Sequence, residues 1–460
     1  MEIDTVRRQY DVVVAGGGVS GCAAAVAAAR CGAKVLVVEE SGYLGGTLTG
    51  CGVGPMMTFH AGEKQVIKGV MQEIVDGLVR RGYSPGHVKD TKQYVSYLTP
   101  FDPEGLKIVL DDMLTGAGCS LLFHTFICGV KCQNRKIESL LLANKDGLTA
   151  AAGQVFLDAT GDGDVAAWSG AKMTKGRPED GAAQPMSTMM KFCNVNTAAL
   201  KDFVLDHPEK FPRLKPYLDL FRQPIPVDLE GFDEEFKAAR ASGELSIPRE
   251  NLLLFGTGRP GEYIANTTRI IDHDATSARS LSDAELVGRR QCAELARFLR
   301  RNVPGFENAL LEFTGPSVGI RGSRQLVGCY TLTARDILER RKFPSVIAHS
   351  AYPIDIHNPK GAGTDSTFLS AQSGISDSYY SIPYEVMVCP EVKNLLVSGR
   401  CVSATFEAQA AIRTTPTAGA IGQAAGVAAA LAATGNADTR AVEVARVQQI
   451  LKKQGAYLDI

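Results

Sequence analysis

The stretch Asp11-Val12-Val13-Val14-Ala15-Gly16-Gly17-Gly18-Val19-Ser20-Gly21 decides the fold of this chain. Its β-branched run predicts a buried strand over Asp11–Ala15, and the Ala-rich run that follows predicts a helix over Ser20–Arg30. A second Val-rich run, Lys34–Glu39, predicts the next strand. Strand, helix and strand in this order form a βαβ unit, which normally belongs to a parallel sheet covered by helices.

The glycines between the first strand and the helix have the spacing of a phosphate-binding turn. Gly16, Gly18 and Gly21 form a GxGxxG pattern. Gly16 permits the tight turn, Gly18 lets the backbone approach a pyrophosphate, and Gly21 lets the helix pack closely on the strand. The amides and the positive dipole end at the helix start then face the phosphates.

Glu39 ends the second predicted strand and supplies an acid for the ribose. A carboxylate at this place accepts hydrogen bonds from ribose hydroxyls and repels a 2′-phosphate, which disfavours NADP. The alternative is a glycine turn without a ligand, and the complete strand–turn–helix context argues against it. By itself this element serves either NAD or FAD.

The length of 460 residues predicts two domains. The fold class that we expect is α/β, with a Rossmann-like dinucleotide-binding domain and an inserted mixed α+β substrate domain. We assign 1–50, 100–175 and 385–460 to the first domain, and 51–99 and 176–384 to the second. Within the second, the stretch before residue 100 is loop-rich, with Gly and Pro punctuation.

Charge and cysteine usage exclude several classes of protein. A formal net charge of −1 provides no field that attracts nucleic acid or an anionic membrane. The cysteine count of 11 is odd and no CxxC occurs, which argues against a disulfide framework and for a reducing compartment. Cys128 and Cys132 lie in a strand-like stretch and fit core packing better than zinc binding, so we expect no metal site.

The chain starts with an acidic segment rather than a secretory signal, so we expect a cytoplasmic protein. We interpret the apolar run from Gly419 to Gly435 as too short and too mildly apolar to span a bilayer. We therefore expect a small-molecule substrate, no nucleic acid or membrane partner, and leave a homo-oligomer open.

Motifs along nearly the whole chain resemble those of the FAD-dependent oxidoreductase family. This is a branch of the glutathione-reductase-like flavoproteins, distantly akin to fumarate reductase flavoprotein subunits, and some members are labelled xanthan lyase. Besides the N-terminal fingerprint, the matching stretches are Tyr43–Gly46, Pro100–Glu104, Ala159–Asp164, Gln184–Ser187, Asn266–Arg269, Val303–Phe306, Tyr352–His357, Ser381–Tyr384 and Asn394–Ala430.

The resemblance implies FAD as the cofactor, bound by residues from both ends of the chain. Gly16, Gly18, Gly21 and Glu39 hold the ADP half on this basis. The other implied contacts are Gly45, Gly46 and Gly399 at the pyrophosphate, Ile127 at the adenine through its backbone, Ala159 and Gly161 on the adenosine side, and the segment from Pro416 to Gln423 at the isoalloxazine edge. A helix that begins near Pro416 can stabilise negative charge on the flavin through its dipole.

Two motifs depart from the family pattern. The chain has Arg321-Gly322-Ser323-Arg324 where relatives often have Arg-Glu-x-Arg, and Thr405-Phe406-Glu407-Ala408 where many have Ser-His-Glu-Ala. The second departure removes a histidine beside the flavin, so catalytic roles do not transfer directly.

His357 is the first candidate for the proton that accompanies flavin chemistry, because it follows an apolar strand-like run and titrates near neutral pH. The alternative is a strand-end histidine bonded to backbone. His60, in the loop after Gly45-Gly46, is a weaker candidate. Tyr379 and Tyr380 either bond a substrate oxygen or pack between domains.

Arg321 and Arg324 would lie on one face if their segment is helical, and there they could clamp a carboxylate. Arg413 precedes the predicted flavin-edge helix and has a similar choice between substrate binding and a structural ion pair.

The sequence thus predicts an FAD-dependent oxidoreductase that exchanges a hydride between flavin N5 and a small polar organic substrate, hydroxylated or carbohydrate-like. One alternative is a flavin-containing electron-transfer subunit that works with a protein partner. The other is a non-redox module with structural FAD. The substrate-specific part rests on analogy with the family.

Overall fold

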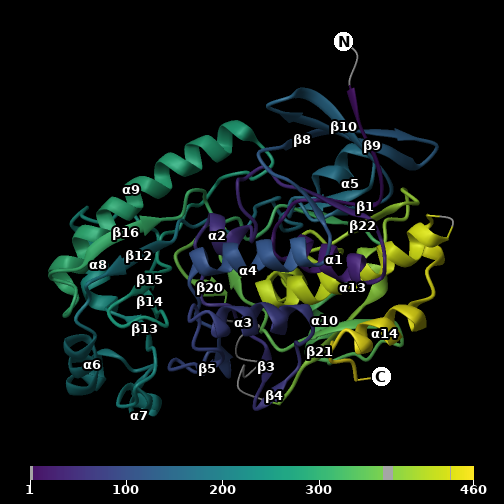
Figure 1. Cartoon of the computed structure of the whole chain (residues 1–460). Coiled ribbons are helices and arrows are strands. Elements are labelled where there is room, and N and C mark those ends of the chain that lie inside the picture. The colour runs from purple at the N-terminus through teal and green to yellow at the C-terminus, as the bar shows by residue number, and fades with distance from the viewer. Residues whose placement is uncertain (1–3, 366–376, 436, 460) are drawn as a thin grey trace.

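The computed structural model of this chain, which describes residues 4–365, 377–435 and 437–459, is built on a seven-stranded sheet (Figure 1). Its strands follow the order β7-β2-β1-β10-β9-β8, and β22 pairs with β10 beside β9. Their bounds are β1 Asp4–Ala15, β2 Val35–Val38, β7 Ser120–Leu122, β8 Phe126–Gln133, β9 Lys136–Asn144, β10 Gly147–Asp158 and β22 Leu395–Val397.

The strands β7, β2, β1, β10 and β22 pair in parallel, whereas β9 and β8 join as antiparallel strands. At the carboxyl end of the parallel part, Ala15 of β1 is in register with Val38 of β2 and with Asp158 of β10, which is in register with Val397 of β22. The turns that follow these four strands therefore leave from one edge of the sheet. Ligands of open α/β sheets bind outside this edge.

Helix α1 (Val19–Arg30) packs along α13 (Thr415–Thr434), and these two helices join the two ends of the chain. A Cβ atom on Gly422 would lie 2.2 Å from Ser20 O, and one on Gly426 would lie 2.0 Å from Ala24 O. The glycines thus allow backbone-to-backbone contact. α3 (Val70–Arg80), α4 (Pro103–Gly116) and α14 (Val444–Lys453) complete this helical layer.

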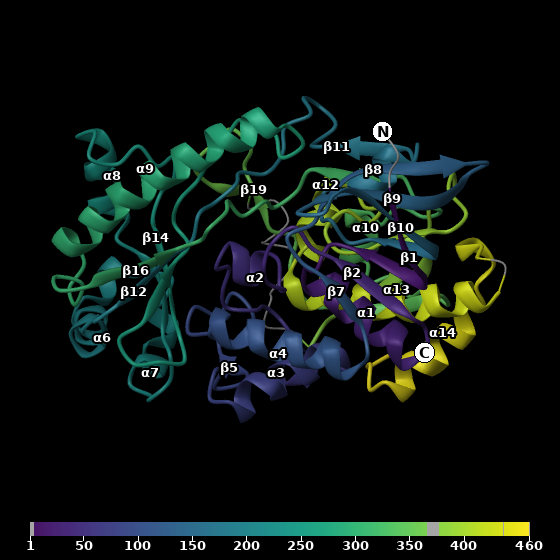
Figure 2. The same cartoon turned by 45° about the horizontal axis from the view of Figure 1, so that its top comes forward.

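A second sheet of five strands forms the other lobe, which lies on the left in Figures 1 and 2. The strand order is β13-β14-β15-β12-β16, and all pairs are antiparallel. The bounds are β12 Met190–Cys193, β13 Asp228–Gly231, β14 Leu252–Gly256, β15 Tyr263–Ala265 and β16 Leu310–Thr314. The long α9 (Ala278–Asn302) crosses this sheet and buries Leu295, Phe298 and Leu299 against it.

Shorter elements connect the two sheets. The strands are β3 His60–Ala61, β4 Lys64–Gln65, β5 Val88–Lys89, β6 Tyr97–Leu98, β11 Met173–Lys175, β17 Arg324–Leu326, β18 Val346–Ser350, β19 Ile356–His357, β20 Thr364–Asp365 and β21 Tyr380–Pro383. The α-helices are α2 Thr47–Gly50, α5 Asp164–Trp168, α6 Thr197–Asp206, α7 Leu218–Phe221, α8 Asp233–Ala241, α10 Ala334–Leu338 and α12 Phe406–Ile412. The 3₁₀ turns among the described residues are η1 Pro208–Lys210, η2 Lys215–Tyr217, η3 Tyr384–Met387 and η4 Thr439–Ala441.

The α/β fold class and the Rossmann-like parallel sheet are confirmed, and a second, antiparallel sheet lies in the sequence between the two parts of the first. The loop-rich interpretation of residues 51–99 missed α3, whose buried Val70, Ile74 and Leu78 recur at helical spacing. This helix packs in the core of α1, α4 and α13. The domain boundaries stay a prediction, and residues 51–99 share their core with the first domain.

Our interpretation of the C-terminal apolar run also needs correction. By length and composition α13 is apolar enough to cross a membrane, yet 83% of its most apolar window is buried inside the protein. Its apolar faces meet α1, β10 and β18. This segment is therefore apolar because it is a core helix, and our interpretation that it is too mildly apolar for a bilayer was wrong.

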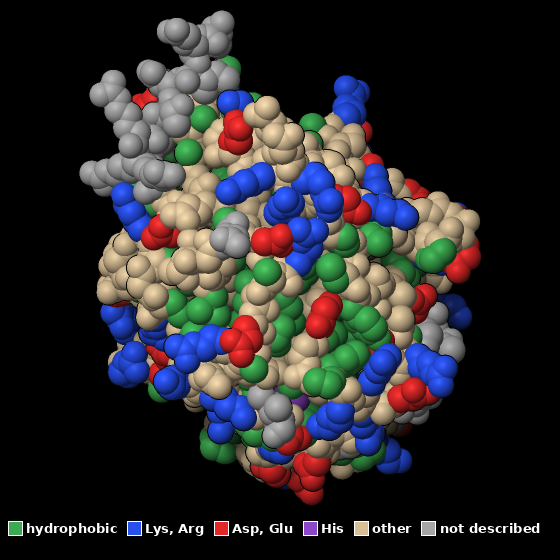
Figure 3. All heavy atoms as spheres, turned by 90° about the vertical axis from the view of Figure 1, so that its right-hand side faces the viewer, with side chains coloured by type: hydrophobic (Ala, Val, Ile, Leu, Met, Phe, Trp, Pro, Cys, Tyr) green, Lys and Arg blue, Asp and Glu red, His purple; other side chains and the backbone are tan. Residues whose placement is uncertain are grey.

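The surface that carries the C-terminal helices is mixed in character (Figure 3). Lys and Arg side chains are interspersed there with Asp and Glu around apolar side chains, in keeping with a formal net charge of −1.

Replacing Gly426 by alanine should lower the free energy of unfolding by about 1–3 kcal/mol, because the new methyl group forces α1 and α13 apart. Gly116→Ala is the matched control, since nothing lies within 4 Å of its Cβ position at the end of α4. Denaturant unfolding should rank the stabilities as Gly116→Ala at or above wild type and Gly426→Ala below it. Equal stability of the two variants would refute the close packing.

Candidate functional site

The first turn at the carboxyl edge of the sheet leads from β1 into α1. Gly16 has a φ of +100°, and a Cβ there would lie 2.6 Å from Ala159 O. A Cβ on Gly21 would lie 2.0 Å from Gly16 O. Both positions therefore require glycine for the packing of the protein itself.

Gly18 differs from these two glycines, because the space around its Cβ position is open. Its backbone is extended, with φ −64° and ψ 173°, and the nearest atom to a Cβ is Gly46 Cα at 3.9 Å. Gly18 is the N-cap of α1, and no side chain caps this helix start. The first-turn amides, which no side chain caps, and the open space fit a pyrophosphate.

Glu39 lies directly beside this turn and is buried. Its carboxylate accepts hydrogen bonds from Gly17 N at 2.6 Å and from Ser41 N at 2.8 Å. The two amides fix the acid next to the phosphate turn, where a ribose would follow the pyrophosphate. Ile127 lies on β8. The residues just before this strand are bonded to the segment of Glu39: His124 N donates to Ser41 O, and Thr125 N donates to Glu39 O.

Gly45 and Gly46 form a second close approach to the first turn. Gly45 N donates to Gly17 O at 2.9 Å, and a Cβ on Gly46 would lie 2.9 Å from Gly18 Cα. Both glycines have positive φ, at +108° and +55°. The geometry brings these two residues to Gly18, as the sequence predicts for a pyrophosphate site.

The turn after β10, from Ala159 to Asp164, is fixed by buried charges. Asp158 accepts from Thr160 N, Thr160 Oγ1 and Ala166 N, and its burial raises its pKa to about 6. Gly161 has a φ of +82°, and a Cβ there would lie 2.3 Å from Arg400 Nη1. Arg400 in turn binds Asp162 at 2.8 Å.

The turn after β22 closes the same edge. Gly399 has a φ of +91°, and its Cβ position lies 3.4 Å from the side chain of Ser20. Ser20 Oγ and Ser398 Oγ share a hydrogen bond of 2.5 Å. The sites predicted at Gly16, Gly18, Gly45, Ala159 and Gly399 thus meet in one place.

Arg321 and Arg324 do not share a helix face, which corrects our conditional expectation. The segment between β16 and β17 is irregular rather than helical, and the two side chains have different partners. Arg324 pairs with Asp164 at 2.9 Å, next to the turn after β10. Arg321 donates through Nη1 to Pro185 O and Ser187 Oγ, at 2.5 and 2.6 Å. Only Arg321 belongs to the cluster described next.

Arg321, Arg413, Asp355 and His357 lie together near the start of α13. Asp355 Oδ2 is 3.5 Å from Arg413 Nη2, 3.3 Å from His357 Nε2 and 3.0 Å from the Tyr352 hydroxyl that donates to it. Burial raises the pKa of the Asp355 carboxyl, but hydrogen bonds from His357 and Tyr352 and the charge of Arg413 hold it well below its usual range. This carboxylate is therefore ionised and shared among three donors.

The protonation of His357 follows from its neighbours. Arg269 Nη1 lies 3.4 Å from Nδ1 and offers only donors, so Nδ1 carries the lone pair and Nε2–H faces Asp355. Burial and the charge of Arg321 lower the pKa of His357 to about 3. The imidazole is therefore neutral at physiological pH.

The first turn of α13 is adjacent to this cluster. Arg413 ends α12 and is followed by Thr414, the N-cap of α13, which makes no side-chain cap bond. Thr417 shares a hydrogen bond of 2.9 Å with Ser350 at the end of β18. Pro416 lies in this first turn, at the place where the resemblance puts the isoalloxazine.

Gln423 lies two turns further along α13 and is engaged within the protein. Its Oε1 accepts from Val70 N at 3.1 Å, and its Nε2 donates to Gln454 O at 3.4 Å. These contacts tie α13 to α3 and α14, and a role for Gln423 at the flavin stays a prediction.

Tyr380, Tyr379 and His60 have other surroundings. The Tyr380 hydroxyl is buried and donates to Tyr352 O at 3.1 Å. Tyr379 is bonded to Asp459 and packs on Tyr457. His60 packs against His87, and its burial lowers its pKa to about 4. Catalytic roles for these three residues stay predictions.

Sequence reasoning missed Asp355 and Arg269, although both lie in stretches that match the family. Asp355 comes two residues before His357 in an extended run, so the two side chains share one side of the chain. That alternation was the available signal. Arg269 had no such signal, because it follows β15 and contacts His357 only in the folded chain.

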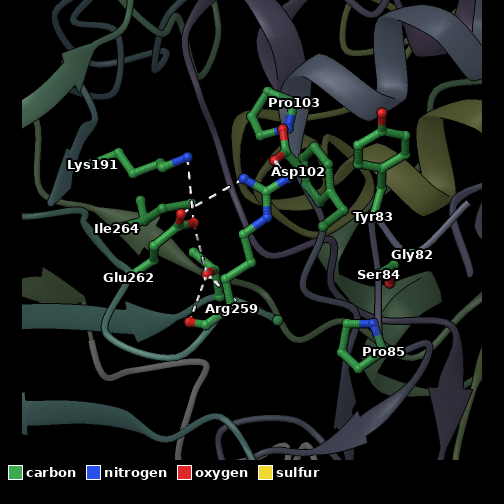
Figure 4. Close-up of a pocket in the computed structure, with 13 residues that line it drawn as sticks. Gly82, Tyr83, Ser84, Pro85, Asp102, Pro103, Lys191, Arg259, Glu262 and Ile264 are labelled. Atoms are coloured by element: carbon green, nitrogen blue, oxygen red, sulfur yellow. Dashed lines mark hydrogen bonds and ion pairs between the residues drawn. The ribbon is translucent and has the colours of Figure 1, made fainter. Parts of the chain in front are cut away.

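A separate cavity of about 130 Å³ lies between the two lobes (Figure 4). It is lined by Asp102 at the start of α4 and by Lys191, Arg259 and Glu262 from the second lobe. Arg259 pairs with Asp102 at 2.8 Å, and Lys191 pairs with Glu262 at 3.3 Å. Each cation here has an acidic partner, so the cavity holds a balanced ion-pair network.

Comparison with known proteins gives a family match over most of the chain. The family described as FAD dependent oxidoreductase matches residues 11–451. The NADH:fumarate oxidoreductase of Klebsiella pneumoniae (strain 342) is 31% identical over 124 residues, which are 26% of this chain and 13% of that protein. The match therefore spans a small part of that relative's length.

Solved structures show distant similarity. A geranylgeranyl bacteriochlorophyll reductase-like protein from Thermoplasma acidophilum is 14% identical, with a TM-score of 0.47 over 97% of this chain and 82% of that chain. The L-proline dehydrogenase from P. horikoshii is 12% identical, with a TM-score of 0.44 over 100% of both chains.

Gly18→Val should fold normally yet lose FAD, because its extended backbone accepts a side chain that then fills the pyrophosphate space. The ratio of visible flavin absorbance to protein absorbance should fall to near zero. The melting temperature of the apoprotein should match that of wild-type apoprotein. Full flavin content in this variant would refute the phosphate site.

His357 should make stability fall in acid. Its folded pKa of about 3 lies below the ordinary 6.5, so between these values the unfolded chain takes up a proton that the native state refuses. The free energy of unfolding should decrease by up to about 1.4 kcal/mol per pH unit as pH falls from 6.5 toward 3. His357→Gln lacks this contribution, so its deficit relative to wild type should shrink with falling pH. Parallel curves from urea unfolding at each pH would contradict the assignment.

Proposed function

Because this chain belongs to the family of FAD-dependent oxidoreductases, we propose that it exchanges a hydride between flavin N5 and a small polar, hydroxylated substrate. Bound FAD supplies the hydride chemistry at N5. The chain itself holds the substrate, excludes water and handles one proton. The observation that carries the proposal is the cluster of Arg413, Asp355 and His357 beside the first turn of α13.

His357 is the proposed proton acceptor when the substrate is oxidised. As the substrate carbon loses a hydride, its hydroxyl must lose a proton. Nδ1 of the neutral imidazole has the lone pair, and its contact with Arg269 is long, at 3.4 Å. A substrate hydroxyl can replace this contact. Asp355 holds Nε2–H and stabilises the imidazolium that forms, as the orienting acid does in other histidine bases.

We propose that Arg413 binds the substrate next to the flavin. It lies between α12 and α13, with its side chain largely buried at 13% exposure. Its Nη2 donates to Asp355 O at 3.3 Å, so the same guanidinium fixes the segment that carries His357. A substrate bound there lies next to the helix start that the resemblance assigns to the flavin edge.

The direct test is to screen hydroxylated metabolites anaerobically against the FAD-loaded protein and record bleaching of the visible spectrum. We expect at least one compound to bleach the flavin. His357→Gln should lower kcat by about 10²–10⁴-fold with unchanged flavin content. His207→Gln is the matched control, because this histidine lies at the end of α6 in the second lobe and pairs with Glu209 there, so kcat should stay near wild type.

Bleaching by a reduced protein and by none of the small compounds would identify an electron-transfer subunit instead. A flavin that no reductant bleaches would contradict redox function altogether.

A further inference from the structure

Four arginines from four separate segments lie near Asp355: Arg413 contacts its carboxylate at 3.5 Å, Arg269 contacts His357 at 3.4 Å, and Arg249 and Arg321 are within reach of its charge. Arg249 precedes β14, Arg269 follows β15, Arg321 precedes β17 and Arg413 ends α12. Arg249 and Arg269 are only 9% and 3% exposed. Such burial of guanidinium groups is costly unless anionic partners compensate their charge.

The acids near this cluster do not compensate it. Asp355 is one carboxylate, and its Oδ2 is shared by Tyr352, His357 and Arg413. Glu230 is bound to Arg213 and Asn251, and Glu250 is exposed. His357 is neutral and adds no negative charge.

The consequence appears in the arginines themselves. Burial and the charges of Arg413, Arg269 and Arg249 lower the pKa of Arg321 to about 9. Burial and the charge of Arg249 lower the pKa of Arg269 to about 10. The four cations thus repel one another across a shared, poorly hydrated space.

Several donors of the cluster have no partner among the described residues. The Nε atoms of Arg269 and Arg413 are buried and unbonded there. Arg321 uses Nη1 for Pro185 O and Ser187 Oγ, which orients its guanidinium while its other nitrogens remain in no described hydrogen bond. An anion is the group that would satisfy these donors.

The balanced cavity of Figure 4 shows how this chain pairs cations elsewhere. There Lys191 and Arg259 are matched by Asp102, Glu262 and Glu312. The arginine cluster lacks such matching, and it lies beside the proposed proton acceptor.

We propose that Arg321 and Arg413, supported by Arg249 and Arg269, bind a carboxylate group of the substrate, which is therefore an organic acid. The planar fork of arginine matches a carboxylate with two parallel hydrogen bonds. The acid group would lie in the same cluster as His357 in this arrangement, so the reacting carbon is close to the carboxylate. This inference rests on the proposed function for the term substrate, whereas the anion site stands on the cluster alone.

Carboxylate binding also prepares His357 as a base. An anion on Arg321 and Arg413 offsets two of the positive charges that disfavour the imidazolium. The binding of the acid and the acceptance of the proton are thus coupled.

The test is calorimetric titration of the FAD-loaded protein with matched pairs of compounds. The pairs are lactate with 1,2-propanediol and D-glucuronate with D-glucose, and inorganic phosphate is a separate arm. At least one carboxylate should bind about tenfold or more tightly than its neutral partner, by the strength of charge-assisted hydrogen bonds. Arg321→Gln and Arg413→Gln should each weaken that binding by about 10–100-fold with flavin content unchanged.

Arg259→Gln is the control, because it removes an exposed arginine that Asp102 and Glu262 already compensate, and it should leave carboxylate affinity as in wild type. Equal affinity for acids and neutral partners, or equal loss in the control, would overturn the anion site. Phosphate binding as tight as the best carboxylate would overturn the carboxylate assignment.

The outcomes distinguish a failure of the proposed hydride exchange from a failure of the proposed carboxylate site. Flavin bleaching by a neutral compound without carboxylate binding would leave the hydride chemistry in place and overturn this inference. Carboxylate binding that depends on Arg321 and Arg413, without bleaching by any small compound, would support the anion site and contradict the proposed hydride exchange.

Discussion

The backbone contact between α1 and α13 is the constraint on which the site depends. Gly422 and Gly426 let α13 approach Ser20 and Ala24 so closely that a methyl group does not fit between them. This contact fixes the last long helix of the chain against the first. It also sets the first turn of α13 relative to the phosphate turn at Gly18, although hundreds of residues separate them in sequence. One cofactor can therefore reach both.

The register of the parallel strands is the second constraint that positions the site. Because β1, β2, β10 and β22 end level with one another, their four turns share one edge. Positive-φ glycines at Gly16, Gly161 and Gly399 keep those turns tight. The glycines at Gly16 and Gly21 serve the packing of the protein, whereas Gly18 leaves room for a ligand. A single motif thus combines structural and binding roles that only its three-dimensional surroundings separate.

The charged residues around the site also differ in how they are paired. Half-buried acids near the turn after β10 are paired, Asp162 with Arg400 and Asp164 with Arg324. Around His357, arginines outnumber their acids. The protein thus concentrates positive charge beside the proposed proton acceptor, and the long connection between β10 and β22 brings in Arg249, Arg269 and Arg321. Fold and local electrostatics are therefore linked through this inserted segment.

The sequence by itself determined the βαβ unit, the phosphate turn and the ribose acid, because these are local patterns of hydrophobic period, glycine spacing and a strand-end carboxylate. It also suggested His357, Arg321 and Arg413 singly. Only the tertiary structure decided that these three lie together with Asp355 and Arg269, and that Arg324 does not, because they come from segments whose distances in space no local pattern encodes. Helical spacing suggested one face for Arg321 and Arg324, but the segment is not helical and directs them to different partners. Long-range packing decides which charges become neighbours.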